Sequence, residues 1–255
     1  MSACYDYGRA GIIGIGTPQA NPTVEAEMRI LLPQNALLQT TRLASSAPES
    51  LDRLREYLWS LPDALARYDT LRPTVFGFGC TGSSYLMPPG FQAAMLTSLE
   101  ARFGYPIVTA TDAIAWHLRA LGARRIALAS PYRGALAEAA LAFWQAEGFE
   151  VAEVREIETA IADTRGIYAL GSTDAGRVTA PLSALPVDAI LLSGTGMPSL
   201  RLIADAHGRS GPPLVSSNYC LAMRLCDVAN ISAPTVEDWG PRLAAATALP
   251  TGPSQ

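Results

Sequence analysis

The sequence carries one short motif twice, about 110 residues apart, and this repetition is the strongest constraint on its fold. Each copy is an apolar run typical of a strand, followed by X-Thr-Gly and by small or polar residues. The copies are VFGFGCTGSS at 75–84 and AILLSGTGMPS at 189–199, and two further pairs follow at a similar offset: 13–18 with 126–131, and 106–110 with 213–217. The sequence therefore predicts two similar halves that carry two corresponding loops.

The two loops differ at one position, because Cys80 in the first corresponds to Gly194 in the second. Only one of the loops can therefore supply a thiol. We expect Gly194 to leave room for a ligand opposite Cys80 rather than to supply a proton. These two residues are the candidate catalytic positions.

Apolar runs alternate with helical patterns along the chain, which predicts a parallel α/β fold. The expected fold class is α/β, with two pseudo-symmetric lobes whose parallel sheets are of flavodoxin-like type and an active site in the cleft between them. The expected strands cover residues 11–16, 37–42, 74–79, 107–109, 125–130, 150–154, 189–193 and 214–216. The expected helices cover residues 50–68, 90–103, 111–121, 136–147, 200–208 and 220–228.

The chain is long enough to form two lobes, since it has 255 residues, of which 49% are hydrophobic. We expect the first lobe to comprise residues 1–110 and 218–233, and the second to comprise residues 111–217. Residues 234–255, which contain four prolines, are expected to form a C-terminal extension that wraps around the lobes or frays.

The charged residues exclude several classes of function. A net charge of −4 argues against binding nucleic acid or an anionic membrane. All 19 basic residues other than histidine are arginine, so neither Schiff-base chemistry nor a P-loop lysine is available. The glycines of residues 11–16 have the spacing G-x-x-G-x-G, the reverse of the dinucleotide fingerprint, and are better explained by close packing inside a sheet. We expect no cofactor.

Cysteine and histidine usage indicates neither a disulfide framework nor a metal site. The four cysteines form no C-x-x-C pair, and the two histidines lie far apart in the sequence. The N-terminal residues do not show the basic region and apolar stretch typical of a signal peptide, and no apolar run reaches the roughly 20 residues that span a bilayer. We expect a cytoplasmic protein without a membrane or nucleic-acid partner, and its assembly into a homo-oligomer stays open.

Cys80 is the candidate nucleophile because it follows a strand and precedes the small residues that begin a helix. Backbone N–H groups at such a position lower the pKa of a thiol and make a thiolate available near neutral pH. The alternative is a buried, inert cysteine. Cys220 and Cys226 fall on a helical pattern and are expected to pack in the core, and Cys4 lies in the N-terminal segment.

Hydroxyl and backbone donors gather on both loops, where they suit a carboxylate or an enediolate oxygen. Ligands of open α/β sheets bind beyond the carboxyl ends of the strands, where these loops lie. Ordinary turn chemistry is the alternative for the loops, helix capping for Asn21, surface packing for Tyr132 and a solvated loop position for Arg165. The candidate substrate-binding residues are Asn21, Thr81, Gly82, Ser83, Tyr132, Arg165, Thr195 and Gly196.

These motifs resemble the Asp/Glu racemase superfamily, in particular its branch of maleate cis–trans isomerases and arylmalonate decarboxylases. The resemblance runs from Tyr7 to Asn230 and rests on the order of the motifs as well as on their residues. They are PQANPTVE at 18–25, similar to the isomerases' P-x-x-N-x-T-x-E, then GCT at 79–81, SPY at 130–132 and LSGTGMPSL at 192–200. The resemblance implies that Asn21 and Tyr132 bind a substrate carboxylate and that Cys80 is the thiolate.

The chain departs from the pattern of both branches. Isomerases and racemases keep a second cysteine where this chain has Gly194, and the decarboxylases have glycine at the first loop and cysteine at the second. Arg165 falls near a substrate-binding asparagine of the isomerases. An ectoine-utilisation protein of the same superfamily is not separated by these motifs.

One cysteine is compatible with two cofactor-independent reactions on a small carboxylic acid. In an isomerase, Cys80 adds to an activated double bond, the carbon–carbon bond rotates, and the thiolate leaves. In a decarboxylase, a malonate-like acid loses carbon dioxide and Cys80 protonates the enediolate. We expect the isomerase, with the decarboxylase as the alternative. A binding protein without turnover is the third hypothesis.

Overall fold

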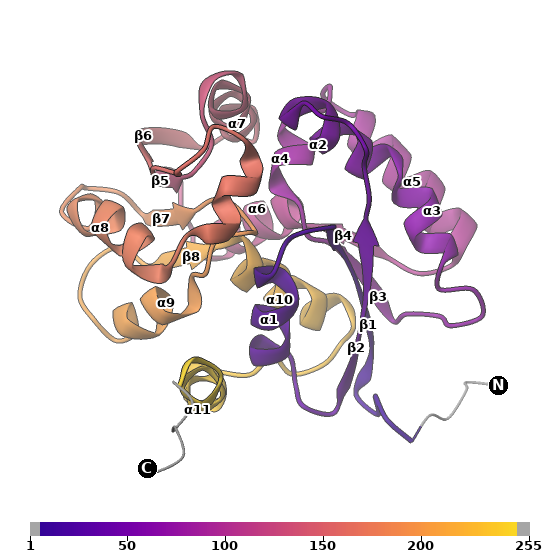
Figure 1. The fold of residues 1–255 in the computed structure, drawn as a ribbon. Coiled ribbons are helices and arrows are strands. Elements are labelled where there is room, and N and C mark those ends of the chain that lie inside the picture. The colour runs from indigo at the N-terminus through magenta and orange to yellow at the C-terminus, as the bar shows by residue number, and fades with distance from the viewer. Residues whose placement is uncertain (1–5, 249–255) are drawn as a thin grey trace, which may run out of the picture.

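The computed structural model describes residues 6–248 and contains two separate parallel sheets of four strands (Figure 1). The first sheet has the order β2-β1-β3-β4 and the second has the order β6-β5-β7-β8. The strands are β1 (Gly11–Pro18), β2 (Ala36–Leu43), β3 (Val75–Phe78), β4 (Ile107–Thr109), β5 (Arg125–Ser130), β6 (Glu150–Glu156), β7 (Ala189–Leu192) and β8 (Leu214–Ser216). All eight predicted strands and the predicted α/β fold class are confirmed.

The two sheets are topological copies of each other, as the repeated motif predicts. The strand that carries the repeated motif, β3 or β7, pairs in each sheet with the first strand of that sheet in chain order, β1 or β5. Ile13 lies opposite Val75 in the first sheet, and Ile126 lies opposite Ala189 in the second. β3 and β7 are buried along their whole length, because helices cover both faces of each sheet. The repeated loops therefore leave equivalent strand ends of two similar sheets.

Helices cover the sheets, and several differ from the prediction. They are α1 (Thr23–Leu31), α2 (Ser50–Trp59), α3 (Leu61–Ala66), α4 (Thr81–Tyr85), α5 (Phe91–Phe103), α6 (Ala110–Ala120), α7 (Gly134–Ala146), the 3-10 helix η1 (Thr164–Ala169), α8 (Ser172–Leu182), α9 (Leu200–Ala206), α10 (Ser217–Val228) and α11 (Val236–Thr247). The single helix predicted over residues 50–68 is wrong, since Ser60 separates α2 from α3 and Pro62 lies in the first turn of α3.

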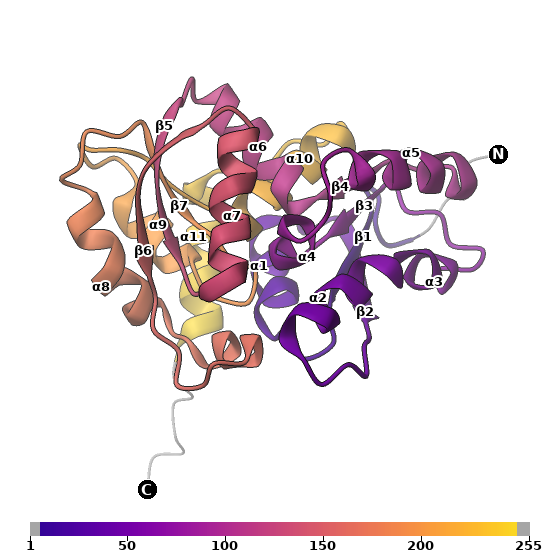
Figure 2. The same cartoon turned by 90° about the horizontal axis from the view of Figure 1, so that it is seen from above.

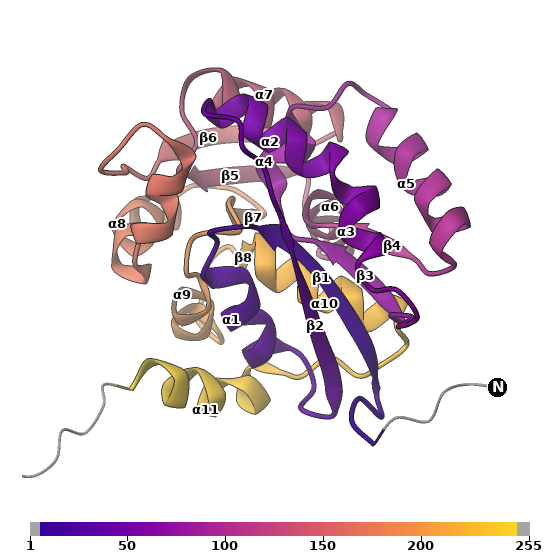
Figure 3. The ribbon, with the colours of Figure 1, turned by 45° about the vertical axis from the view of Figure 1, so that its right-hand side comes forward.

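The C-terminal segment is partly helical, although its prolines predicted a wrapping or frayed extension. Pro241 lies inside α11, and the helix is anchored by Trp239, whose side chain is fully buried. α11 packs against α1 and α9, so it contacts elements of both lobes (Figure 3). An apolar anchor therefore compensates for the backbone hydrogen bond that proline removes.

The two lobes lie side by side and share a helical boundary (Figure 2). α10 follows β8, the last strand of the second sheet, and packs on α6. It also packs on α1 and β3, so the chain returns to elements of the first lobe. α4 also packs against α7 across this boundary. Among residues 6–248, no helix combines the length and apolar character needed to cross a membrane.

Candidate active site

The two repeated loops meet at the boundary between the lobes. Gly79 and Cys80 follow β3, and Ser193 and Gly194 follow β7. The Thr195 hydroxyl donates a hydrogen bond to the Gly79 carbonyl oxygen over 3.0 Å. The structure thus brings the residues beside Cys80 and Gly194 into direct contact, although they are far apart in the sequence.

Cys80 is buried immediately before α4 and has 4% of its surface exposed. Burial raises the pKa of its thiol, while the Ser83 hydroxyl and the backbone N–H groups of Ser83 and Gly82 act to lower it. The Ser83 Oγ atom lies 3.1 Å from the Cys80 sulfur. The prediction of a lowered pKa for Cys80 is therefore wrong. The cost of burying a charged sulfur is larger than the stabilisation that the hydrogen bonds at the start of the short helix α4 give to the thiolate.

Gly194 does not leave the open space that its lack of a side chain suggested. A Cβ atom at this position would lie 3.3 Å from both Cγ and Cδ of Pro131, and 3.7 Å from the Tyr132 hydroxyl. Gly194 also has φ +128°, a conformation that residues with side chains rarely adopt. Its backbone N–H donates to the Ser217 hydroxyl over 3.0 Å, which fixes the loop in this conformation.

Tyr132 and Thr81 place two hydroxyl groups between the loops. The two oxygens lie 2.7 Å apart, and both residues are buried. The Tyr132 ring packs edge-on against Tyr85, with ring centroids 5.9 Å apart. Gly82 allows this approach, because a Cβ there would lie 3.1 Å from a methyl carbon of Leu54 and 3.6 Å from the Tyr132 hydroxyl.

Cys80 is surrounded by tyrosines from four different elements, which are Tyr57, Tyr85, Tyr132 and Tyr168. Burial raises the pKa of all four hydroxyls, and a negative charge on the nearby Cys80 sulfur would raise each of them further. These hydroxyls therefore stay neutral and can donate hydrogen bonds to an anion. Only Tyr132 was predicted, because the other three lie in helical segments with no distinctive local pattern.

Asn21 links the start of α1 to the second loop. Its Oδ1 accepts hydrogen bonds from the backbone N–H groups of Thr23 and Val24, so the predicted capping role is confirmed. Its Nδ2 lies 3.4 Å from the Thr195 hydroxyl, and the Thr23 hydroxyl donates to the Gly196 carbonyl over 2.8 Å. Asn21 and Thr23 of the first lobe therefore contact two consecutive residues of the second loop, Thr195 and Gly196.

Gly196 is required by the packing of this loop against η1. A Cβ atom at Gly196 would lie 2.8 Å from two ring carbons of Tyr168, closer than real Cβ contacts allow. The ring of Tyr168, which lies on η1, therefore covers the second loop at Gly196.

Glu27 is a buried carboxylate that sequence reasoning missed. It accepts hydrogen bonds from the backbone N–H groups of Ser199 and Leu200 over 2.6 and 3.2 Å, and from Asn218 Nδ2 over 2.7 Å. Asn218 Nδ2 also donates to the Thr195 carbonyl over 3.0 Å. Burial raises the pKa of Glu27, against these hydrogen bonds. This acid joins α1 to the end of the second loop, and no local pattern signals a contact between residues so distant in sequence.

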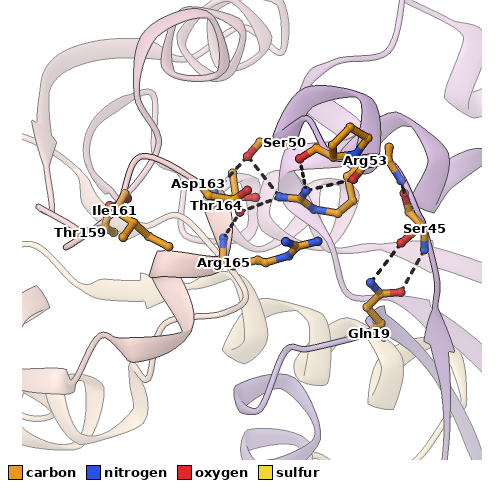
Figure 4. A network of polar contacts seen from close by, with 11 residues as sticks. Gln19, Ser45, Ser50, Arg53, Thr159, Ile161, Asp163, Thr164 and Arg165 are labelled. Atoms are coloured by element: carbon orange, nitrogen blue, oxygen red, sulfur yellow. Dashed lines mark hydrogen bonds and ion pairs between the residues drawn. The ribbon is translucent and has the colours of Figure 1, made fainter.

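Arg165 lies on η1, at the exposed edge of the site (Figure 4). Its backbone N–H donates to Asp163 Oδ1 over 2.8 Å, and its side chain extends toward the first lobe. The same Asp163 oxygen accepts a hydrogen bond from Arg53 Nη2 over 2.6 Å. Arg53 comes from α2 and was not predicted as a site residue.

A cavity of about 180 Å³ opens beside Tyr132, at the boundary between the lobes. One wall contains Ser50 and Leu51 at the start of α2. The opposite walls contain Pro131, Tyr132, Arg133, Ala135, Leu136, Thr159, Ala162, Asp163, Thr164 and Ile167. The cavity therefore combines apolar and polar surfaces next to the buried hydroxyls.

The remaining cysteines and the histidines lie away from this site. Cys220 and Cys226 are fully buried in α10, as predicted, and Cys4 lies outside the described residues. His117 packs edge-on against Tyr219, with centroids 5.4 Å apart, and His207 pairs with Glu237 at 3.2 Å. Within residues 6–248, no cluster of three or more histidine, cysteine or acidic side chains is arranged to hold a metal ion.

Comparison with known proteins relates most of the chain to two groups of enzymes. The sequence model of a family described as arylmalonate decarboxylase matches residues 13–235. An arylmalonate decarboxylase from Bordetella bronchiseptica is 30% identical over 212 residues, which cover 81% of this chain and 85% of the relative. A maleate isomerase from Nocardia farcinica is 28% identical over 221 residues, which cover 80% of this chain and 84% of the relative.

Solved structures confirm the fold. One is the maleate cis–trans isomerase of Nocardia farcinica, as a cysteine-to-serine mutant with a covalently bound succinylcysteine intermediate. It superimposes with a TM-score of 0.76 and 25% identity, covering 88% of this chain and 95% of that one. The two-lobed architecture is therefore shared along nearly the whole length of both chains.

Proposed function

Because the chain belongs to the arylmalonate decarboxylase family, we propose that it is a cofactor-independent isomerase of a small carboxylic or dicarboxylic acid, with Cys80 as its nucleophile. The observation that carries this proposal is the single thiol at the meeting point of the two repeated loops, surrounded by neutral hydroxyl donors. A relative named maleate isomerase is similar over most of the chain, and a structure from that group holds a covalent adduct on cysteine.

The proposed reaction begins when the Cys80 thiol gives up its proton to water and the resulting thiolate attacks one carbon of an activated double bond. A sulfur–carbon bond forms, and the π electron pair moves onto the neighbouring carboxylate as an enediolate. The former double bond is now single and rotates. The electron pair then returns, the sulfur–carbon bond breaks, and the isomer leaves with no net transfer of a proton.

We assign the stabilisation of this enediolate to the donors that the loops bring together. The hydroxyls of Tyr132 and Thr81 are hydrogen-bonded to each other, and both can donate to one developing oxyanion when it replaces that bond. Asn21, Thr195 and the backbone of Gly82 and Gly196 complete the proposed carboxylate contacts, and Ser83 stabilises the sulfur. Arg165 is proposed to hold a second anionic group of the substrate at the edge of the site.

Decarboxylation is the second candidate, and the raised pKa of Cys80 favours it. A thiol that stays protonated at neutral pH is already in the form that donates a proton. The carbon–carbon bond to one carboxylate would break, carbon dioxide would leave, and the electron pair would remain on the enediolate. Cys80 would then protonate one face, and water would restore its proton.

A panel of unsaturated diacids and disubstituted malonates distinguishes these functions. We expect the protein to interconvert cis and trans isomers without releasing carbon dioxide, and Cys80→Ala to lose this activity by more than about 10³-fold. Release of carbon dioxide would replace the isomerase assignment by the decarboxylase. Tight binding of the acids without turnover would favour the remaining alternatives, an ectoine-utilisation protein or a non-catalytic carboxylate-binding protein.

The proposed partner is thus a small carboxylate, and we place the protein in the cytoplasm. Three free thiols among the described residues, all buried, support a reducing compartment.

A further inference from the structure

Arg53 is a buried cation whose hydrogen bonds all go to acceptors near one end of α2. Only 1% of its side chain is exposed. Nη1 donates to the carbonyl oxygens of Ala47 and Pro48, over 3.2 and 2.9 Å, and Nη2 donates to Ser50 and Asp163, over 3.2 and 2.6 Å. The guanidinium group therefore occupies a fixed position in the first lobe, because its planar fork serves four acceptors at once.

Asp163 brings the second lobe to this fixed group (Figure 4). It is the acidic partner of Arg53 across the lobe boundary, and 30% of its side chain is exposed. Its Oδ1 also accepts from the Arg165 backbone N–H. One residue away, the Thr164 backbone N–H donates to the Ser50 hydroxyl over 3.3 Å. Two consecutive residues of the second lobe, Asp163 and Thr164, are therefore tied to α2 through Arg53 and Ser50.

The segment held in this way forms one side of the cavity beside Tyr132. Thr159, Ala162, Asp163, Thr164 and Ile167 line the cavity, and Ser50 and Leu51 face them from α2. The width of the cavity therefore depends on the distance between α2 and this segment. Arg53 does not line the cavity, but its hydrogen bond to Asp163 joins the two sides.

We infer that Arg53 is a positioning residue for substrate selection: by holding Asp163 across the lobe boundary, it sets the position of residues 159–167 and so decides which substituents of a carboxylic acid the site admits. This inference rests on the proposed function, because it concerns the part of the substrate that does not react. A substituent on the reacting acid would enter the cavity, and its contacts with Ala162 and Ile167 would require a fixed wall.

The test compares variants that loosen the wall to different degrees, with maleate and 2-substituted maleates of increasing size as substrates. Ser50→Ala removes the acceptor of Thr164 and one acceptor of Arg53 without changing any charge. Arg53→Lys keeps the charge, but an ammonium group cannot serve all four acceptors. Arg119→Lys is the matched control, because its ion pair with Glu147 lies in the second lobe, away from the cavity. Thermal unfolding of each variant shows whether it is folded.

We expect KM to rise by roughly tenfold to hundredfold for the substituted acids in Arg53→Lys, and by less in Ser50→Ala. The kcat value for maleate should change much less, because the contacts around Cys80 are untouched. Arg119→Lys should behave as the parent protein does. An equal effect on every substrate in a folded Arg53→Lys variant would overturn the inference.

Binding measurements separate this inference from the proposed function. In Cys80→Ala, calorimetry with the same acids reports the selection of substituents without any turnover. If the parent protein turns over none of the acids but Arg53→Lys in this background still weakens only the substituted ones, the isomerase proposal fails and the role of Arg53 stands. If turnover is present and Arg53→Lys leaves the ranking of the acids unchanged, only the role of Arg53 fails.

Discussion

The Ser83 hydroxyl lies 3.1 Å from the Cys80 sulfur and 2.6 Å from the Leu54 carbonyl oxygen. A hydroxyl has only one proton to donate. While it donates to Leu54, it can only accept a hydrogen bond from the protonated thiol, and it must turn toward sulfur when Cys80 ionises. Ser83 is therefore placed to respond to the protonation state of the thiol.

Removing the Ser83 hydroxyl should make Cys80 harder to ionise. Burial raises the pKa of Cys80 and the Ser83 hydrogen bond lowers it, so Ser83→Ala should move the alkylation profile with iodoacetamide to still higher pH. Ser84→Ala is a close control, because the buried Ser84 hydroxyl has no hydrogen-bond partner among the described residues. A profile for Ser83→Ala at or below that of the parent protein would contradict this role.

Tyr132→Phe should impair turnover more than folding. The substitution removes the hydroxyl paired with Thr81, and loss of one such donor to an oxyanion typically costs about 10²- to 10³-fold in kcat. Tyr105→Phe offers a comparison, since the buried Tyr105 hydroxyl has no partner in the described structure. Steady-state kinetics on the best substrate of the panel measures the effect. Equal rates for the two variants would remove Tyr132 from the proposed oxyanion contacts.

Gly194→Ala should destabilise the protein, even though it adds only one methyl group. The φ of +128° disfavours any side chain, and the new Cβ would press on Pro131, so we expect a loss of about 1–3 kcal/mol in the free energy of unfolding. Gly240→Ala in α11 should instead be neutral or stabilising, because nothing lies within 4 Å of its Cβ position. Urea denaturation measures both changes, and an unchanged midpoint for Gly194→Ala would show that the loop adapts freely.

Glu27 should give the stability of the protein a distinctive dependence on pH. Its pKa is raised in the folded state, mainly by burial, so the folded protein binds more protons than the unfolded chain above pH 4.5. The contribution of Glu27 to the free energy of unfolding is therefore fully present below the pKa that Glu27 has in the unfolded chain. It is lost as the pH rises through the pKa of Glu27 in the folded protein, by about 1.4 kcal/mol for each unit by which folding raises that pKa.

Glu27→Gln should remove this part of the pH dependence. Urea denaturation between pH 4 and 8 should show the free energy of unfolding of the parent protein falling relative to that of Glu27→Gln as pH rises. Glu138→Gln, on the exposed face of α7, should follow the parent protein. Parallel curves for the parent and Glu27→Gln would contradict the assignment of this titration to Glu27.

The strands and the meeting of the two loops were predictable because short, contiguous sequence patterns indicate both. Continuous apolar runs mark strands covered on two faces, and the repeat places two loops at equivalent strand ends. The helix α8 was missed because Gly176 and Pro181 weaken its helical signal. Local sequence alone gives α8 little propensity, so its packing against α9 and the strands of the second sheet decides its conformation.

The contacts that hold the site in place were not predictable in the same way. Glu27 meets Ser199, and Arg53 meets Asp163, across the boundary between the lobes. Such pairs are fixed by tertiary packing, and nothing in the neighbouring residues identifies the partner. The pKa of Cys80 shows the same limit, since the loop motif reveals the hydrogen bonds to sulfur but not the depth of burial that opposes them.

The conformation of Gly194 constrains how a second thiol could be engineered opposite Cys80. A Gly194→Cys substitution would place the new side chain on a backbone that disfavours it and against Pro131. A second thiol at this position would therefore be introduced at a cost in stability that the loop or Pro131 has to absorb. The Cys80 loop and the Gly194 loop therefore differ in backbone as well as in side chain, and an engineered second thiol would be easier to introduce together with a smaller residue in place of Pro131.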